Sequence, residues 1–164
     1  MTTSSLATTG EFRKLLTQRK VYSDGVNRPP EIAWEQLRAR AREATARSYA
    51  PYSHVSVGAS GLADNGETVV GSNVENASYG LTLCAECSLV SDLVRVGGTR
   101  LVAVSIVAGD GEPIAPCGRC RQVLYEHGGK DLLIDAGEGT APKRLEELLP
   151  DAFGPEDLGV RRNP

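Results

Sequence analysis

The run LVAVSIVA, residues 101–108, decides the fold, because Ser105 is its only polar side chain. A short apolar run of this kind is typical of a strand that is buried on both faces of a sheet. Helical segments flank it: residues 81–96 carry apolar side chains at helical spacing, and residues 117–127 form a second helix. Each segment ends at a pair of glycines, which stop helices. A buried strand between two helices predicts crossover connections.

The remaining elements extend this alternation. They are, in order, a helix over 31–48, strands over 55–59 and 68–72 joined by an Asp-Asn-Gly turn at 64–66, a strand over 132–134 and a helix over 143–149. Consecutive helices and strands in this order predict an α/β fold, with a mixed sheet that carries helices on its faces.

Length and charge restrict the function. The chain has 164 residues, of which 40% are hydrophobic and 24% charged, as expected for one soluble globular domain. Its net charge of −3 argues against a nucleic-acid partner, because such binders usually carry a basic face. The basic run Arg38-Ala39-Arg40-Ala41-Arg42 is interpreted as the solvated side of a helix.

No apolar stretch is long enough for a membrane helix, and residues 1–10 lack the apolar core of a signal peptide. We therefore expect a cytoplasmic protein without a membrane partner. Thiols are kept reduced in that compartment, so the four cysteines suggest metal binding or catalysis before disulfides. Residues 1–29 start rich in Ser and Thr and end in prolines, which predicts a flexible appendage. Residues 30–154 would form the catalytic domain, and residues 155–164 a C-terminal tail.

Two short segments carry the chemistry: Cys84-Ala85-Glu86 and Pro116-Cys117-Gly118-Arg119-Cys120. Both lie at predicted helix starts, where the partial positive charge of the helix stabilises thiolates. Cys117 and Cys120 are one helical turn apart and so share a face. Three thiolates from two helix starts suit zinc, and three protein ligands leave the fourth position open for water, as in catalytic sites. Glu86, two residues from a ligand, is placed to move protons.

Other interpretations stay open. Cys87 turns the first segment into C-x-x-C, so four cysteines would also fit a closed structural zinc site without catalysis. A redox disulfide pair is a third option. The gap between the segments holds a buried strand rather than a small zinc loop, and a structural site needs neither Glu86 nor Pro116, so we favour the catalytic interpretation.

The chain resembles the small zinc-dependent cytidine deaminases, which are homotetramers. The resemblance rests on blocks in the same order, namely residues 49–53 (YAPYS), 57–59 (VGA), 73–79 (NVENASY), 84–86 (CAE) and 116–122 (PCGRCRQ). It implies a three-layer α/β/α sandwich with a mostly five-stranded mixed sheet. It also implies hydrolytic deamination of cytidine and deoxycytidine in pyrimidine salvage, with Zn²⁺ as cofactor and active sites shared between subunits.

The resemblance assigns roles to individual positions. Cys84, Cys117 and Cys120 would bind zinc, and Glu86 would carry protons from the zinc-activated water to N3 and the amino group of cytosine. Asn73 and Glu75 would hydrogen-bond the ribose hydroxyls. The remaining substrate-binding positions would be Val55, Tyr79, Ala85 and Phe153. Tyr79 and Phe153 would reach a neighbouring subunit's pocket, although Phe153 also fits a simple anchor for the C-terminal segment.

Two positions depart from the family pattern. Val55 stands where the family often has an aromatic residue, and Cys87 stands where many members have an arginine. Three thiolates over-neutralise a zinc dication, so the helix starts must offset the surplus charge, helped by Arg119 or Arg121. Cys87 is predicted to be a neutral neighbour of the ligands. A deaminase of RNA or of a nucleoside antibiotic remains an alternative, and the acidic charge with Asn73 and Glu75 argues against RNA.

Overall fold

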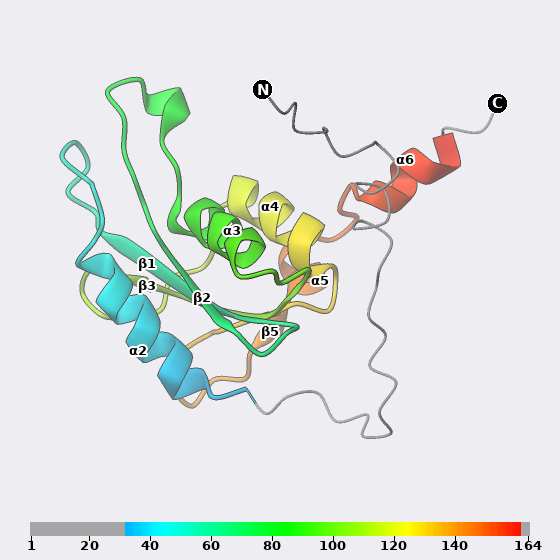
Figure 1. Ribbon diagram of the computed structural model, residues 1–164, viewed down its shortest axis with the longest axis horizontal. Helices are drawn as coiled ribbons and strands as arrows, with labels where there is room; N and C mark the ends of the chain where they lie inside the picture. Colours follow the sequence, from blue (N-terminus) through cyan, green and yellow to red (C-terminus); the bar gives the residue numbers. More distant parts are fainter. Residues whose placement is uncertain (1–31, 162–164) are drawn as a thin grey trace, which may run out of the picture. The chain divides into compact units, whose positions relative to one another are not determined.

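A computed structural model of the chain describes residues 32–161 (Figure 1). The predicted appendage, residues 1–29, lies outside the described residues, as do the last three residues of the predicted tail. Within the described part, no helix is both long and apolar enough to cross a membrane.

The sheet has five strands in the order β2-β1-β3-β4-β5. They are β1 (Val57–Ala63), β2 (Thr68–Ser72), β3 (Leu101–Ala108), β4 (Leu133–Ile134) and β5 (Lys143–Arg144). β1 pairs antiparallel with both β2 and β3, β3 pairs parallel with β4, and β4 pairs antiparallel with β5. The predicted mixed five-stranded sheet is therefore confirmed, and the run at 101–108 is its middle strand.

Helices cover both faces of the sheet. The helical elements of the described chain are α2 (Trp34–Thr45), α3 (Ala85–Arg95), α4 (Gly118–Gly128), the short α5 (Leu145–Leu148) and α6 (Pro155–Arg161), with a 3₁₀ turn η1 at Tyr79–Leu81. Figure 1 shows α3 and α4 side by side, away from α2. Two glycines on neighbouring strands show that α2 and α3 lie on opposite faces.

Gly58 on β1 faces α2, because a Cβ built there would lie 2.0 Å from the carbonyl oxygen of Ala41. Gly71 on β2 faces α3, because its Cβ would lie 2.2 Å from the carbonyl oxygen of Ala85. Gly58 pairs with Ser72, so Gly71, one residue before Ser72, must face the other way. Each helix thus packs closely against the sheet at a glycine, where the strand has no side chain. On the α3 side, this contact fixes the first turn of the helix that carries Glu86.

The core lies mainly between the sheet and α3 with α4. Its buried side chains include Ala59, Val69, Leu89, Leu93, Leu101, Val104, Leu124 and Ile134. Leu89 and Leu93, one helical turn apart on α3, are both buried.

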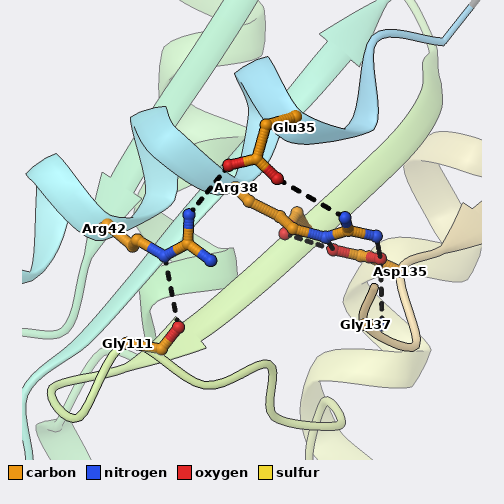
Figure 2. Close-up of polar contacts among 7 residues, drawn as sticks. Glu35, Arg38, Arg42, Gly111, Asp135 and Gly137 are labelled. Carbon is orange, nitrogen blue, oxygen red and sulfur yellow. Dashed lines mark hydrogen bonds and ion pairs between the residues drawn. The ribbon is translucent and has the colours of Figure 1, made fainter. Parts of the chain in front are cut away.

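A buried ion pair lies beneath α2, and it corrects one sequence interpretation. Arg38 is only 8% exposed, whereas the basic run 38–42 was expected to be solvated. Its guanidinium donates two hydrogen bonds to the carboxylate of Asp135, at 2.9 and 2.8 Å (Figure 2). The Ser105 hydroxyl on β3 and the Gly137 amide also donate to this carboxylate, at 2.8 and 3.1 Å. Nothing in the repeated Arg-x-Arg pattern indicates that one of the arginines is buried.

The outer part of this network continues along α2. The exposed Glu35 carboxylate contacts Arg38 at 3.6 Å and Arg42 at 3.1 Å, and Arg42 also donates to the Gly111 carbonyl at 3.3 Å (Figure 2). The network therefore connects α2 to the loop that follows β3 and to the segment that follows β4.

Some boundaries differ from the sequence analysis. The helix predicted over 81–96 begins only at Ala85, because Leu83 is still extended and pairs with Val74. The helix predicted over 143–149 is shorter, since Lys143–Arg144 instead form the edge strand β5. The segment predicted as a tail from residue 155 contains the helix α6, for which no amphipathic pattern was found.

Candidate metal and active site

Cys84 and Cys117 are the N-cap residues of α3 and α4, both with extended backbone. Cys120 lies in the first turn of α4, on the same face as Cys117. The three sulfur atoms lie within 4.8 Å of one another. The prediction that two helix starts bring these cysteines together is therefore confirmed by the geometry.

The pKa shifts of the three thiols indicate what the cluster needs in order to ionise. Burial, assisted by the negative charge of Glu86, raises the pKa of the Cys120 thiol strongly above its usual range. Burial also raises the pKa of Cys84. At Cys117 burial acts in the same direction, but hydrogen bonds from Cys120 and Cys84 bring its pKa below the usual value. Three thiolates this close repel one another, so a bound cation is what allows them to ionise together.

The donor set fits zinc. Three sulfur ligands leave one position of a tetrahedral site for water, as in catalytic zinc sites. Cys87 is not part of the cluster. Its sulfur instead accepts a hydrogen bond from the Arg119 guanidinium, at 3.7 Å. This arrangement does not favour the structural site with four cysteine ligands, because the fourth sulfur is occupied elsewhere.

Glu86 lies in the first turn of α3 and is only 4% exposed. Its negative charge opposes ionisation of all three clustered thiols, although hydrogen bonds outweigh this effect at Cys117, and this interaction places the Glu86 carboxylate beside the cluster. Within residues 32–161, no side chain or backbone amide donates a hydrogen bond to it. A buried carboxylate without a protein donor beside a metal site is available to accept a proton from water.

Asn73 is buried and joins three segments. Its amide oxygen accepts from the Ser48 hydroxyl at 2.6 Å and from the Val57 amide at 2.8 Å. Its amide nitrogen donates to the Val55 carbonyl at 2.9 Å. Both acceptor positions of the oxygen are thus used, and one proton of the nitrogen remains for a ligand.

Glu75 is half-buried and fixed by the loop that precedes β1. Its carboxylate accepts from the amides of Tyr52 and Ser53, at 2.9 and 3.2 Å, and from the Ser53 hydroxyl. The Ser53 hydroxyl bond is the main cause that lowers the pKa of this carboxyl. Tyr52 and Ser53 belong to the block at residues 49–53, but no local pattern there indicates that they hold Glu75.

The other predicted positions vary in exposure. Ala85, the first residue of α3, is fully buried, whereas Val55 is 51% exposed and lines an open hollow with Thr45 and Ala108. Tyr79 is 76% exposed in the 3₁₀ turn of the arm formed by residues 73–84, and its ring centroid lies 6.0 Å from that of Tyr52. Figure 1 shows this arm projecting from the sheet. Phe153 is 52% exposed, and its carbonyl accepts from Gln122 of α4 at 2.8 Å.

Comparison with known proteins agrees with this geometry. The profile of the family described as cytidine and deoxycytidylate deaminase zinc-binding region matches residues 33–135. The chain belongs to this family. A cytidine deaminase of Mycobacterium tuberculosis is 56% identical over 133 residues, which cover 81% of this chain and 98% of that relative.

Solved structures give the same result. The crystal structure of cytidine deaminase from Mycobacterium tuberculosis matches with a TM-score of 0.72 and 56% identity, over 76% of this chain and 99% of that one. That of cytidine deaminase from Burkholderia pseudomallei matches with a TM-score of 0.67 and 37% identity, over 74% and 100%. Membership in the deaminase family, through its zinc-binding region, confirms the predicted α/β fold and the zinc cofactor.

Two further residues position this deaminase site. Gly71 allows the start of α3 to rest on β2, and a glycine inside a strand is a sequence signal for such a close approach. Arg121 donates to the carbonyls of Pro116 and Leu148, at 3.0 and 2.7 Å, and so holds the segment before Cys117. It points to backbone rather than to the sulfurs.

Proposed function

We propose that this chain catalyses the hydrolytic deamination of cytidine and deoxycytidine to uridine and deoxyuridine, with release of ammonia. The observation that carries the proposal is the cluster of Cys84, Cys117 and Cys120 beside the buried carboxylate of Glu86. Family membership supports it, because relatives at 56% identity are cytidine deaminases. The three cysteines would hold one zinc ion, which when bound supplies activation of a water molecule as the nucleophile.

Glu86 would carry the protons. Its carboxylate takes a proton from the attacking water and delivers it to ring N3 of the cytosine. It then takes the remaining proton of the added hydroxyl group and passes it to the amino group at C4, which leaves as ammonia. One water is consumed for each ammonia released. The support is that Glu86 is buried next to the sulfurs and that no described residue competes for its carboxylate.

Asn73 and Glu75 would recognise the ribose. The free proton of the Asn73 amide and the ionised carboxylate of Glu75 offer one donor and one acceptor, which suits neutral hydroxyl groups. Both side chains are already held by the protein, so binding need not order them. Ala85 and Val55 would contact the base, with Val55 in place of an aromatic side chain.

Active sites shared between the subunits of a homotetramer are the second part of the proposal. Tyr79 and Phe153 are large apolar side chains that remain mostly exposed in the single chain, and Leu81 beside Tyr79 is 65% exposed. A projecting arm with exposed apolar side chains is suited to contact another subunit. Light scattering should give four chains per particle, and Tyr79→Ala should weaken substrate binding more than it changes zinc content.

We also propose a role in pyrimidine salvage in the cytoplasm. The support is that the described cysteines are all free, as thiols in a reducing compartment are.

The experiment that tests the main proposal follows the ultraviolet absorbance of cytidine and deoxycytidine with the purified protein, with and without a chelator. We expect conversion of both nucleosides, abolished by the chelator and restored by added zinc. A protein that holds zinc yet turns over neither nucleoside would refute the proposal.

A further inference from the structure

Arg119 lies at the junction of the two segments that build the sulfur cluster. It occupies the first turn of α4, between Cys117 and Cys120. Its Nη2 atom donates to the Thr82 carbonyl at 3.0 Å and to the Cys87 sulfur at 3.7 Å. Thr82 and Cys87 flank Cys84 on either side in the chain. One guanidinium thus connects the segment that carries two of the clustered cysteines to the segment that carries the third.

The charge of this guanidinium complements the cluster. A zinc ion bound by three thiolates carries one net negative charge, and the Glu86 carboxylate beside it adds another. The guanidinium belongs to the residue directly before Cys120 and contacts both sides of the Cys84 segment, so its positive charge lies next to the cluster. No other arginine with described contacts plays this part. Arg121 uses its donors on two backbone carbonyls instead.

We propose that Arg119 is a positioning residue of the metal site, whose guanidinium holds the Cys84 segment against α4 and offsets the surplus negative charge of the three thiolates. The inference rests on the zinc site of the proposed function. Two consequences follow. Zinc is held more tightly, because the cation stabilises the ionised thiols that zinc requires. When zinc is bound, a water that it activates would lose its proton at lower pH, because a nearby positive charge favours the ionised form.

The test compares Arg119→Gln with Arg119→Lys. Both side chains retain an N–H donor for the Thr82 carbonyl, but only lysine keeps the positive charge. Arg40→Gln is the matched control, since it removes one exposed arginine charge from α2, which lies on the opposite face of the sheet. Zinc affinity is measured by competition with a chromophoric chelator, and the acid limb of the pH profile of cytidine turnover is recorded for each protein.

We expect Arg119→Gln to bind zinc about 10-fold more weakly, in the range found for residues that support metal ligands. Its pH profile should shift to higher pH. Arg119→Lys and Arg40→Gln should stay near the wild type in both measurements. An unchanged affinity and pH profile in Arg119→Gln would overturn the inference, and so would equal losses in the Gln and Lys variants, because charge would then not be the cause. Neither outcome would affect the proposed function, whereas a wild-type protein without zinc would overturn both.

Discussion

Gly71 on β2 lies so close to the start of α3 that a Cβ on it would come within 2.2 Å of the Ala85 carbonyl oxygen and 2.3 Å of the Leu89 nitrogen. Both atoms belong to the helix backbone, so neither can move aside as a flexible side chain would. The same turn of α3 carries Glu86 and begins at Cys84. The distance between the strand and the helix thus fixes where the proton carrier and one sulfur lie.

Gly71→Ala should therefore disturb both stability and the metal site. Forcing a methyl group into this contact should lower the free energy of unfolding by about 1–3 kcal/mol. It should also reduce the zinc content, because Cys84 moves away from Cys117 and Cys120. Urea unfolding and metal analysis measure the two effects. Gly118→Ala is the control, since its Cβ meets nothing within 4 Å. If Gly71→Ala unfolds like the wild type and keeps its zinc, the close contact does not position the site.

Glu86→Gln should separate catalysis from metal binding. The substitution keeps the size of the side chain but removes its ability to accept and return a proton. We expect a loss of about 10²–10⁴ in kcat, with zinc content and melting temperature close to those of the wild type. Metal analysis and the ultraviolet assay on the same preparation decide between the outcomes. Turnover near the wild-type rate would rule out Glu86 as the proton carrier.

Much of the site could be predicted from the sequence, because the site residues lie at or next to the first residues of predicted helices. The pairing of Cys84 with Cys117 and Cys120 follows from two helices that begin on the same side of a sheet, and local patterns indicate both helices. The middle strand at 101–108 could be predicted from its continuous apolar run. In each case a local pattern determines the structure.

The parts that could not be predicted depend on pairings between residues that are not sequence neighbours. Arg38 pairs with Asp135, 97 residues away, and nothing in its neighbourhood distinguishes it from the solvated Arg40. The arm at 73–84 extends the chain where helical spacing favoured an earlier start of α3, because Val74 and Leu83 hydrogen-bond to each other. A tertiary contact in both cases overrides the local preference.

Cys87→Ala and Cys84→Ala should differ sharply in metal content. Cys84 belongs to the sulfur cluster, whereas the Cys87 sulfur lies outside it and contacts Arg119. We expect Cys87→Ala to retain about one zinc per chain, and Cys84→Ala to lose most of it, since two thiolates hold zinc far less well than three. Metal analysis after gel filtration measures this. Equal losses in the two variants would mean that Cys87 is a zinc ligand after all.

The buried pair of Arg38 and Asp135 should make stability sensitive to acid. Burial alone would raise the pKa of Asp135, but hydrogen bonds from Arg38, Ser105 and Gly137 and the charge of Arg38 outweigh it, so the folded pKa lies below the usual value. A carboxyl with a lowered pKa in the folded state contributes stability that is fully present above its unfolded pKa of about 3.9. That contribution is lost as the pH falls from there through the folded pKa.

Asp135→Asn tests this contribution directly. The substitution leaves the Arg38 charge buried without its partner, which should cost about 3 kcal/mol at pH 7. The variant should also lose less stability than the wild type between about pH 4 and the acid unfolding of the protein, because it lacks this titrating group. Asp131→Asn is the control, since it breaks an exposed ion pair with Arg144 at 3.1 Å and should cost less than about 1 kcal/mol. Urea unfolding at several pH values measures all three proteins. Equal costs for the two substitutions would show that burial of the Arg38 pair adds nothing to the stability of the fold.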